Sequence, residues 1–447
     1  MQPDISDSGG PMRCAASRPI RRNCWIVVLG AALSLGAAAG SGAAEGPAQA
    51  GRSAEEEEDA VARRLRELEA RIGRLLAQVE RLRAAAAGSA AVAELEKRIE
   101  ALAREIERLK IGAAAAPEAE ESILGLGPAA SKIYKLNRGV SIGGYGEMLY
   151  QNLDSRRDDG TTSAATDRLD FLRAVFYFGY KFNDRFLFNS EIEFEHAVAG
   201  DGEAGEVAVE FAYIDFRASR RFGARGGLLL IPMGFLNELH EPPIFHGARR
   251  PEVERFIIPT TWRENGVGVY GEAGPVSYRA YVVASLDARG FTAEEGIRGG
   301  RQNGSRSAAE DLAVTARLDY SPVPGVLLGA SAFTGRTGQG DPARGGARIT
   351  LWDAHAEWGW RGLRLRGLYA TSELDDADRV SAANPDTVGE EARGWYAEIA
   401  WNVLAPAGRT GQDLSPFFRY EAYDTQHRVA PGFAADPAND RSSAPWG

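Results

Sequence analysis

Cysteine is almost absent from this sequence of 447 residues. The two cysteines, Cys14 and Cys24, both lie in an N-terminal segment that we expect to be removed on export. Their loss excludes a disulfide framework, a cysteine nucleophile and a thiolate metal site in the mature chain. Positive charge is also in deficit, with a formal net charge of -10, which excludes a generic basic nucleic-acid binder.

Long apolar runs are scarce as well, and the one that exists extends from Cys24 to Ala39. A chain with so little helical apolar sequence must enter a membrane as strands, because lipid forces every backbone polar group to be paired within the protein. Neither a Gly-x-Ser-x-Gly nucleophile elbow nor a phosphate-binding loop is evident. We therefore expect no enzyme, no catalytic residue and no cofactor.

The N-terminus has the pattern of an export signal. Four arginines precede the apolar run, at Arg13, Arg18, Arg21 and Arg22, and small residues follow it at 41–44. This order of charged, apolar and small residues predicts a cleaved signal peptide over residues 1–44. A single transmembrane anchor is the alternative, but the run is short for a span of about 20 residues.

Residues 55–110 are predicted to form a periplasmic coiled coil, because apolar residues recur three and four apart. The apolar positions are Val61, Leu65, Leu68, Ile72, Leu75, Val79 and Leu82, then Val92, Leu95, Ile99, Leu102, Ile106 and Leu109. Ile and Leu at the core positions favour two helices in the coil, whereas a trimeric assembly of the chain would prefer three. The break at Gly88 also permits a helical hairpin within one chain. Residues 111–139 follow as a linker rich in Ala, Glu, Pro and Gly, which predicts flexibility.

From Val140 onward the apolar pattern changes to alternation, which predicts strands. The predicted strands are 140–151, 168–180, 185–195, 206–218, 222–231, 265–273, 275–286, 312–322, 325–334, 347–359, 362–372, 392–403 and 416–424. Aromatic residues near their ends predict interfacial girdles. These aromatics are Tyr145, Tyr150, Tyr177, Tyr180, Tyr213, Tyr270, Tyr278, Tyr281, Trp358, Trp360, Trp395 and Trp401.

The clearest strand is 185–195. Its apolar face carries Phe186, Phe188, Ile192 and Phe194, and its other face carries Asn189, Glu191, Glu193 and Glu195. Alternation places the two sets on opposite sides of a sheet. In a membrane barrel the apolar set faces lipid, and the polar set forms a solvated wall of the lumen.

Short and long connections alternate through almost the whole array, with 404–415 as the exception. Outer-membrane barrels have short periplasmic turns and long external loops, so residues 140–447 are predicted to form such a barrel. The strand count is odd, and the sequence lacks a terminal amphipathic strand ending on Phe. We therefore expect an incomplete barrel, whose full parent has about sixteen strands.

The longest connection, 232–264, follows the fifth predicted strand, where general porins have a loop that narrows the channel. It contains Pro-Met-Gly-Phe at 232–235, His-Glu-Pro-Pro at 240–243, Arg-Arg-Pro at 249–251 and Ile-Pro-Thr-Thr-Trp-Arg-Glu-Asn-Gly at 258–266. With these motifs the segment from Gly143 to Gly271 resembles the phosphate-selective porin O and P family. The resemblance implies a trimeric, sixteen-stranded channel that passes anions or other small solutes.

This loop supplies the candidate pore residues, which are Arg249, Arg250, Arg255, Arg263, Glu238, Glu241 and Asn237. The arginines would attract anions, since guanidinium groups bind phosphate well. The interleaved glutamates allow the alternative that the loop holds itself shut by ion pairs. His240 and His246 match no zinc motif, so we expect no metal.

The sequence thus predicts an outer-membrane porin for passive diffusion of small hydrophilic solutes, including anions such as phosphate. The expected partners are outer-membrane lipid, further copies in a homotrimer and the solutes, and no nucleic acid. The alternative is a structural envelope tether, in which the barrel only anchors a coiled coil that spans the periplasm.

Overall fold

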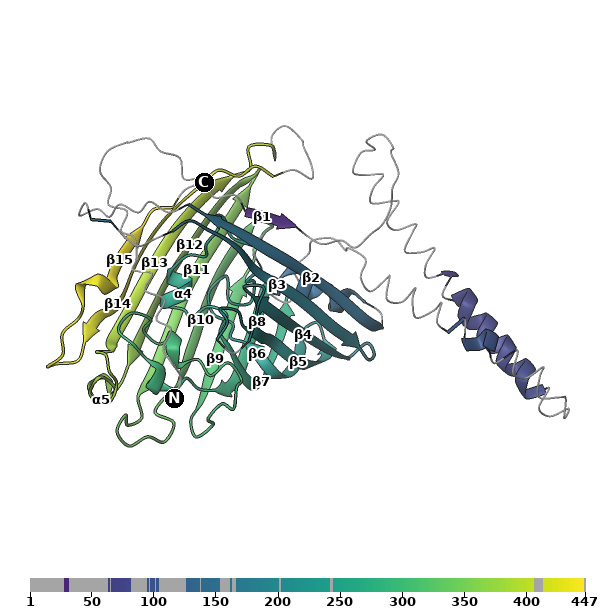
Figure 1. Cartoon of the computed structure of the whole chain (residues 1–447), viewed down its shortest axis with the longest axis horizontal. Coiled ribbons are helices and arrows are strands. Elements are labelled where there is room, and N and C mark those ends of the chain that lie inside the picture. The colour runs from purple at the N-terminus through teal and green to yellow at the C-terminus, as the bar shows by residue number, and fades with distance from the viewer. Residues whose placement is uncertain are drawn as a thin grey trace.

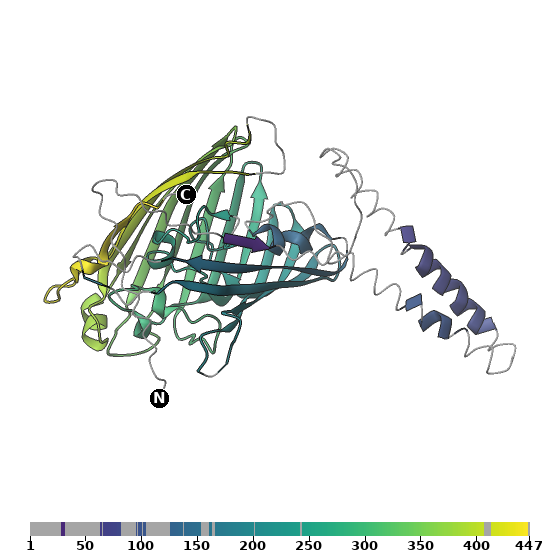
Figure 2. The same ribbon diagram turned by 45° about the horizontal axis from the view of Figure 1, so that its top comes forward.

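The fold is that of a computed structural model of the chain. It describes residues 28–31, 63–64, 66–81, 95, 97–100, 102–103, 126–136, 138–152, 161–162, 166–200, 202–241, 244–405 and 413–445. Its main feature is one antiparallel sheet of fifteen strands in which each strand pairs with the next along the chain. Figures 1 and 2 show this sheet rolled into an open barrel, with α4 (Val253–Phe256) on its inner side.

The predicted strands correspond one to one with β2 through β14. These are β2 (Gly139–Gln151), β3 (Arg168–Lys181), β4 (Phe186–Glu195), β5 (Val207–Ser219), β6 (Phe222–Leu230), β7 (Arg263–Ala273), β8 (Val276–Ala284), β9 (Leu312–Tyr320), β10 (Val326–Arg336), β11 (Arg348–Trp360), β12 (Leu363–Leu374), β13 (Gly389–Trp401) and β14 (Phe417–Val429). Alternating apolar residues and turn chemistry were thus sufficient to locate every long strand.

Two short strands were not predicted, and they form the ends of the sheet. β15 (Asp440–Ser443) pairs with β14, and β1 (Val28–Ala31) pairs with the free edge of β2. β15 is polar, so its sequence carries no strand signal. β1 belongs to the predicted export signal, the rest of which lies outside the described residues. Among the described strands β1 and β15 do not pair with each other, so the sheet is not closed as a complete barrel would be.

The connections alternate in length as expected. Short turns at 182–185, 220–221, 274–275, 321–325 and 361–362 join the strands at one rim. Longer connections join them at the other rim, including 285–311 with η2 (Ala288–Gly290) and η3 (Arg298–Gly300), and 375–388 with α5 (Ala377–Ala383). The connection 402–416 remains the exception, and η5 (Pro437–Asn439) precedes β15.

The outer face of the sheet is apolar and the inner face is charged, the reverse of a soluble protein. Phe176, Phe178 and Ile214 are 41 to 46% exposed, whereas Glu191 and Asp215 on the inner face are fully buried. The five tryptophans of β11 and β13 also face outward. They are Trp352, Trp358, Trp360, Trp395 and Trp401.

The predicted aromatic girdles need one correction. Tyr177, Tyr213, Tyr270 and Tyr281 are buried on the inner face instead of standing at an interface. Parity explains this difference, because side chains alternate along a strand and Tyr177 lies between the outward-facing Phe176 and Phe178.

The predicted linker contains an ordered helix, α3 (Pro128–Lys135), that packs on the inner face of β2, β3 and β4. Ile133 and Tyr134 of α3 are buried. Gly179 of β3 permits this approach, because a Cβ there would lie 2.8 Å from Cγ1 of Ile133. The composition of residues 111–139 predicts flexibility, whereas in the structure Ile133 packs against Gly179 and Tyr134 bonds to Asp215, and these contacts seat the helix on the sheet.

The described part of the heptad segment is helical, over residues 63–64, 66–81, 97–100 and 102–103. Val79 and Leu95 are buried together, with Leu75 and Ile99 against them. A hairpin centred near Gly88 would make such a contact. Stoichiometry and the boundaries 55–110 stay predictions.

None of the helices in the described ranges combines the length and apolar content needed to cross a bilayer.

Candidate functional site

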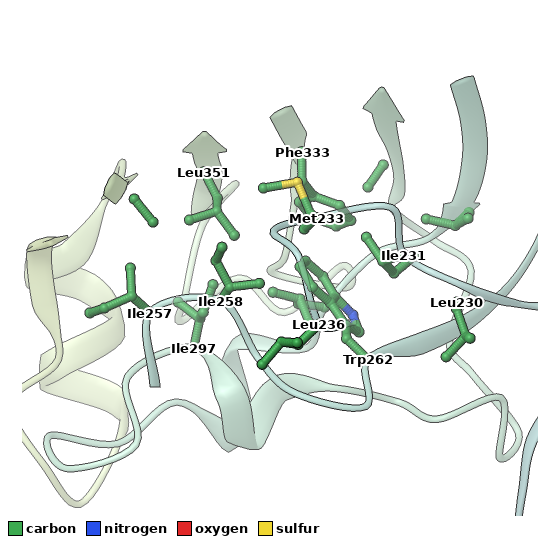
Figure 3. Close-up of a cluster of buried hydrophobic side chains, with 14 of the residues drawn as sticks. Leu230, Ile231, Met233, Leu236, Ile257, Ile258, Trp262, Ile297, Phe333 and Leu351 are labelled. Atoms are coloured by element: carbon green, nitrogen blue, oxygen red, sulfur yellow. The ribbon is translucent and has the colours of Figure 1, made fainter. Parts of the chain in front are cut away.

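The loop between β6 and β7 folds onto the inner face of the sheet in its described parts, residues 231–241 and 244–262, and we refer to it as the inserted loop. Its apolar side chains pack on strands from across the barrel, as Figure 3 shows for Met233 and Ile258 near Phe333 of β10 and Leu351 of β11. Trp262 is fully buried, and its ring centroid lies 4.5 Å from that of Phe333. Burial of this cluster is the main force that holds the loop inside.

Asn237 ties the two ends of the inserted loop together. Its Nδ2 donates to the carbonyl oxygens of Ile231 at 2.7 Å and Trp262 at 2.8 Å, and its Oδ1 accepts from the backbone N–H of Trp262 at 2.7 Å. The side chain is 2% exposed. The structure therefore places this predicted pore residue at the base of the loop, where it sets the loop's conformation.

Three inward-facing arginines of β9, β12 and β14 bind backbone carbonyls of the inserted loop. Arg317 donates to Gly234, Arg366 to Ile244 at 3.2 Å, and Arg419 to Arg249 at 3.2 Å. Because backbone carbonyls are the acceptors, these arginines fix the path of the loop without requiring particular side chains on it.

Carboxylates on the neighbouring strands bind the loop's donors. Asp353 accepts the N–H of Gly234 at 3.1 Å, Glu421 accepts the N–H of Glu252 at 2.6 Å, and Glu398 binds Nδ1 of His246 at 2.9 Å. We call this set of three arginines and three carboxylates the anchoring ladder. It is a row of charged hydrogen bonds, which are stronger than neutral ones.

The ladder was not predicted from the sequence. Its signal is present as charged residues at alternate strand positions, as in Arg317 and Asp319 or Arg419 and Glu421. Parity places these residues on the inner face, but which loop atoms they bind depends on contacts far apart in the chain.

The short helix α4 lies in the inserted loop and contacts β13. Tyr396 donates to Glu254 at 2.7 Å, and the N–H of Leu236 donates to the same carboxylate at 2.8 Å. Burial raises the pKa of Glu254, and the two hydrogen bonds oppose that rise. Gly394 of β13 leaves room for α4, because a Cβ there would lie 3.1 Å from Ile257.

The four arginines predicted to line a constriction have different surroundings. Arg263 forms an ion pair with Glu210 at 2.8 Å, and Arg255 pairs with Glu252 at 3.6 Å. Arg250 donates to Thr260, to Thr261 at 3.1 Å and to the carbonyl of His240 at 3.0 Å. Burial, together with the nearby Arg173, lowers the pKa of Arg250. Arg249 is exposed.

The predicted glutamates of the loop are also engaged. Glu238 pairs with Arg279 at 3.2 Å, and Glu241 accepts the N–H of Ala130 in α3 at 3.4 Å. Burial raises the pKa of both carboxyl groups. The two glutamates thus bind β8 and α3, whereas the ion pair of Arg255 with Glu252 lies within the loop itself. A role for these charges at a constriction stays a prediction.

The predicted lumen wall on β4 faces inward, but three of its four residues are buried. Glu191 bonds to Nε2 of His240 at 3.0 Å, Glu193 pairs with Arg173 at 2.8 Å, and Asn189 donates to the carbonyl of Ala130 at 3.0 Å. Glu195 is partly exposed. The expectation of a solvated wall is therefore wrong for this quadrant, because the inserted loop and α3 cover it.

Within the described residues no group of three His, Cys, Asp or Glu side chains is arranged to hold a metal ion.

The rolled antiparallel sheet and the loop on its inner face define a protein of the β-barrel class, with its lumen partly filled by its own chain. The chain belongs to the same family as an uncharacterized protein of Aquifex aeolicus (strain VF5). The two are 42% identical over 329 residues, which cover 71% of this chain and 73% of the relative. No family model matches the sequence.

Several solved structures of outer-membrane proteins are similar at low sequence identity. Salmonella typhi OmpF in complex with daunomycin has a TM-score of 0.43 and 12% identity, over 66% of this chain and 83% of that one. The outer-membrane channel DcaP of Acinetobacter baumannii has a TM-score of 0.36 and 12% identity, over 69% and 95%. Pseudomonas aeruginosa OccK2 in complex with glucuronate has a TM-score of 0.33 and 12% identity, over 70% and 94%.

Proposed function

We propose that this chain is an outer-membrane porin through which small hydrophilic solutes diffuse passively. The observation that carries the proposal is the reversed polarity of the sheet. Large apolar side chains such as Phe176 and Trp395 stand exposed on the outer face, and charged residues such as Arg317 and Asp353 line the inner one. An exposed apolar surface of this extent needs lipid around it, and a charged interior is typical of membrane barrels with aqueous channels.

The inserted loop is the proposed constriction, since it crosses the lumen and is anchored on both sides. Its position would be set by Asn237, by the anchoring ladder and by the pair of His240 and Glu191. Solutes would pass beside this loop, whose exposed basic side chains include Arg249.

We expect weak ion selectivity, and phosphate preference has no support from the inner charges. Arg366 pairs with Glu357 at 2.5 Å, Arg419 with Glu398 at 3.2 Å and Arg317 with Asp319 at 2.8 Å. A paired arginine attracts anions less than a free one, because the neighbouring carboxylate cancels most of its field. A homotrimer of such channels is part of the proposal.

Reconstitution in a planar bilayer tests the proposal. The full chain should give discrete conductance steps, and a potassium chloride gradient should give a reversal potential close to zero. A strongly anion-selective reversal potential would contradict the argument from paired arginines. Folded, inserted protein that never conducts would contradict the channel itself.

The second candidate function is the structural tether, and the filled quadrant of the lumen favours it. Asn189 and Glu191 are buried beneath α3 and the inserted loop, which leaves less room for a solute path. The absence of conductance steps from inserted protein would support this function, in which the barrel anchors the N-terminal helical segment.

A further inference from the structure

Helix α3 is connected to the inserted loop as well as to the wall of the barrel. Glu241 of the loop accepts the N–H of Ala130 in the first turn of α3 at 3.4 Å. The two segments approach closely at Gly127, where a Cβ would lie 2.0 Å from Oε1 of Glu241. A carboxylate in this position satisfies a free donor of the helix and complements the helix dipole.

The middle of α3 is held by apolar packing and by a polar side chain. Ile133 is 1% exposed and lies on Gly179 of β3. Asn189 of β4 donates to the carbonyl of Ala130, and Lys132 donates to the carbonyl of Ile142 in β2 at 3.2 Å. These contacts join α3 to three consecutive strands.

The last turn of α3 enters a cluster of polar aromatic residues near the short-turn rim. Tyr134 donates to Asp215 at 2.6 Å and lies 3.0 Å from the hydroxyl of Tyr213. Arg225 pairs with Asp215 at 3.3 Å, and its guanidinium lies over the rings of Tyr213 and Tyr270. Burial, with the neighbouring Tyr213, raises the pKa of the Tyr134 hydroxyl well above its ordinary value, so the hydroxyl stays a donor.

We propose that α3 is an internal plug, which occupies the lumen beside β2 to β5 and holds the inserted loop in its constricting position through Glu241. This inference rests on the proposed channel function. Polar contacts of Glu241, Asn189 and Asp215 hold α3, and among its described side chains Ile133 and Tyr134 are the large ones that pack in the apolar cluster. A docked state of this kind can be released without unfolding the sheet, whose ladders do not include α3. Release would widen the path beside the loop.

A disulfide between Ile133→Cys and Gly179→Cys tests the plug directly. A Cβ at Gly179 lies 3.0 Å from the Cβ of Ile133, so a small shift reaches the usual separation of about 3.8 Å. The variant is made with Cys14→Ser and Cys24→Ser, which leaves the new pair as the only cysteines. Mobility on a non-reducing gel reports whether the bond forms in the folded protein.

Single-channel recording of this variant, oxidised and then reduced, reports what the plug does. We expect the oxidised protein to remain at its lowest conductance and the reduced protein to add openings to a higher level. Failure of the disulfide to form would overturn the docking, and equal conductance in both redox states would overturn the plug. If no current is seen in either redox state, and none after deletion of residues 128–135, the channel function on which the plug depends would be overturned.

A point variant gives a second measure that leaves the packing intact. Tyr134→Phe removes a hydrogen bond to a buried carboxylate and should raise the ratio of released to docked states by about 10- to 150-fold, since such bonds contribute about 1.5–3 kcal/mol and about 1.4 kcal/mol is tenfold. The matched control is Tyr150→Phe, on the outer face of β2, which should leave the openings unchanged. Equal effects of the two variants would contradict a role for docking.

Discussion

At the scale of single residues, the inserted loop is held by a few polar side chains that bind backbone. Asn237 is the clearest case, because one amide satisfies three buried backbone groups. Asn237→Ala should lower the free energy of unfolding by about 3 kcal/mol, since each buried polar group left unpaired costs about 1–3 kcal/mol. Denaturant unfolding in detergent micelles measures this.

The matched control for that variant is Asn152→Ala. Asn152 also donates a side-chain hydrogen bond, to Asp167 at 2.8 Å, but the pair is exposed. Its loss should change stability by less than about 0.5 kcal/mol. Comparable losses in the two variants would contradict the assignment of Asn237 as the tie at the base of the loop.

The pair of His240 and Glu191 makes the loop's stability depend on pH. Burial lowers the pKa of His240, but the charge and hydrogen bond of Glu191 raise it more, so the net shift is upward from 6.5. Arg250 opposes this rise and Glu210 adds to it. A raised pKa in the folded state means that the pair stabilises fully below about pH 6.5 and less as pH increases through the raised value.

The variant His240→Gln checks that sign. We expect it to be less stable than the wild type by a few degrees in thermal unfolding at pH 6, with the difference shrinking in alkaline buffer. His427→Gln is the control, because His427 is partly exposed and lies 3.7 Å from Asp424. A stability gap for His240→Gln that grows with pH would contradict the account.

At the scale of elements, alternation and turn chemistry were sufficient to predict β2 through β14, because each strand carries its own local signal. The loop 232–264 was identified by its length and motifs. The docking of α3 could not be predicted. Its eight residues include one isoleucine and one tyrosine, and nothing in that sequence indicates that they contact Gly179 and Asp215, which lie far along the chain. The partners of Arg366 and Arg419 were missed for the same reason, because they lie more than a hundred residues away.

The packing of α4 against Gly394 of β13 leads to a prediction about this helix. Gly394→Leu places a side chain where Ile257 and Val253 lie within 3.2 Å, so α4 should be displaced from the wall. Trypsin should then cleave more rapidly at Arg255, whose side chain is 42% exposed in the seated loop.

Gly367→Leu is the matched control for that experiment. Gly367 is in the neighbouring strand β12, and nothing lies closer than 3.6 Å to a Cβ built there. Cleavage at Arg255 that is equally fast in the two variants would contradict the seating of α4 on Gly394.

At the scale of the whole molecule, the apolar face of the sheet points outward and the charged face points inward, whereas a soluble protein has the opposite arrangement. The eight tryptophans of the sequence make this arrangement measurable. Trp395 is 43% exposed on the outer face, whereas Trp262 is fully buried in the inserted loop. The two therefore report on opposite sides of the same sheet.

Fluorescence quenching by brominated lipid tests the reversed polarity most directly. Two variants are reconstituted in vesicles, one that retains only Trp395 and one that retains only Trp262, with phenylalanine at the other positions. We predict that bromine in the lipid chains strongly quenches Trp395 and leaves the emission of Trp262 nearly unchanged. Equal quenching of the two, or quenching of Trp262 alone, would contradict a barrel whose outer face meets lipid and whose inner face holds the loop.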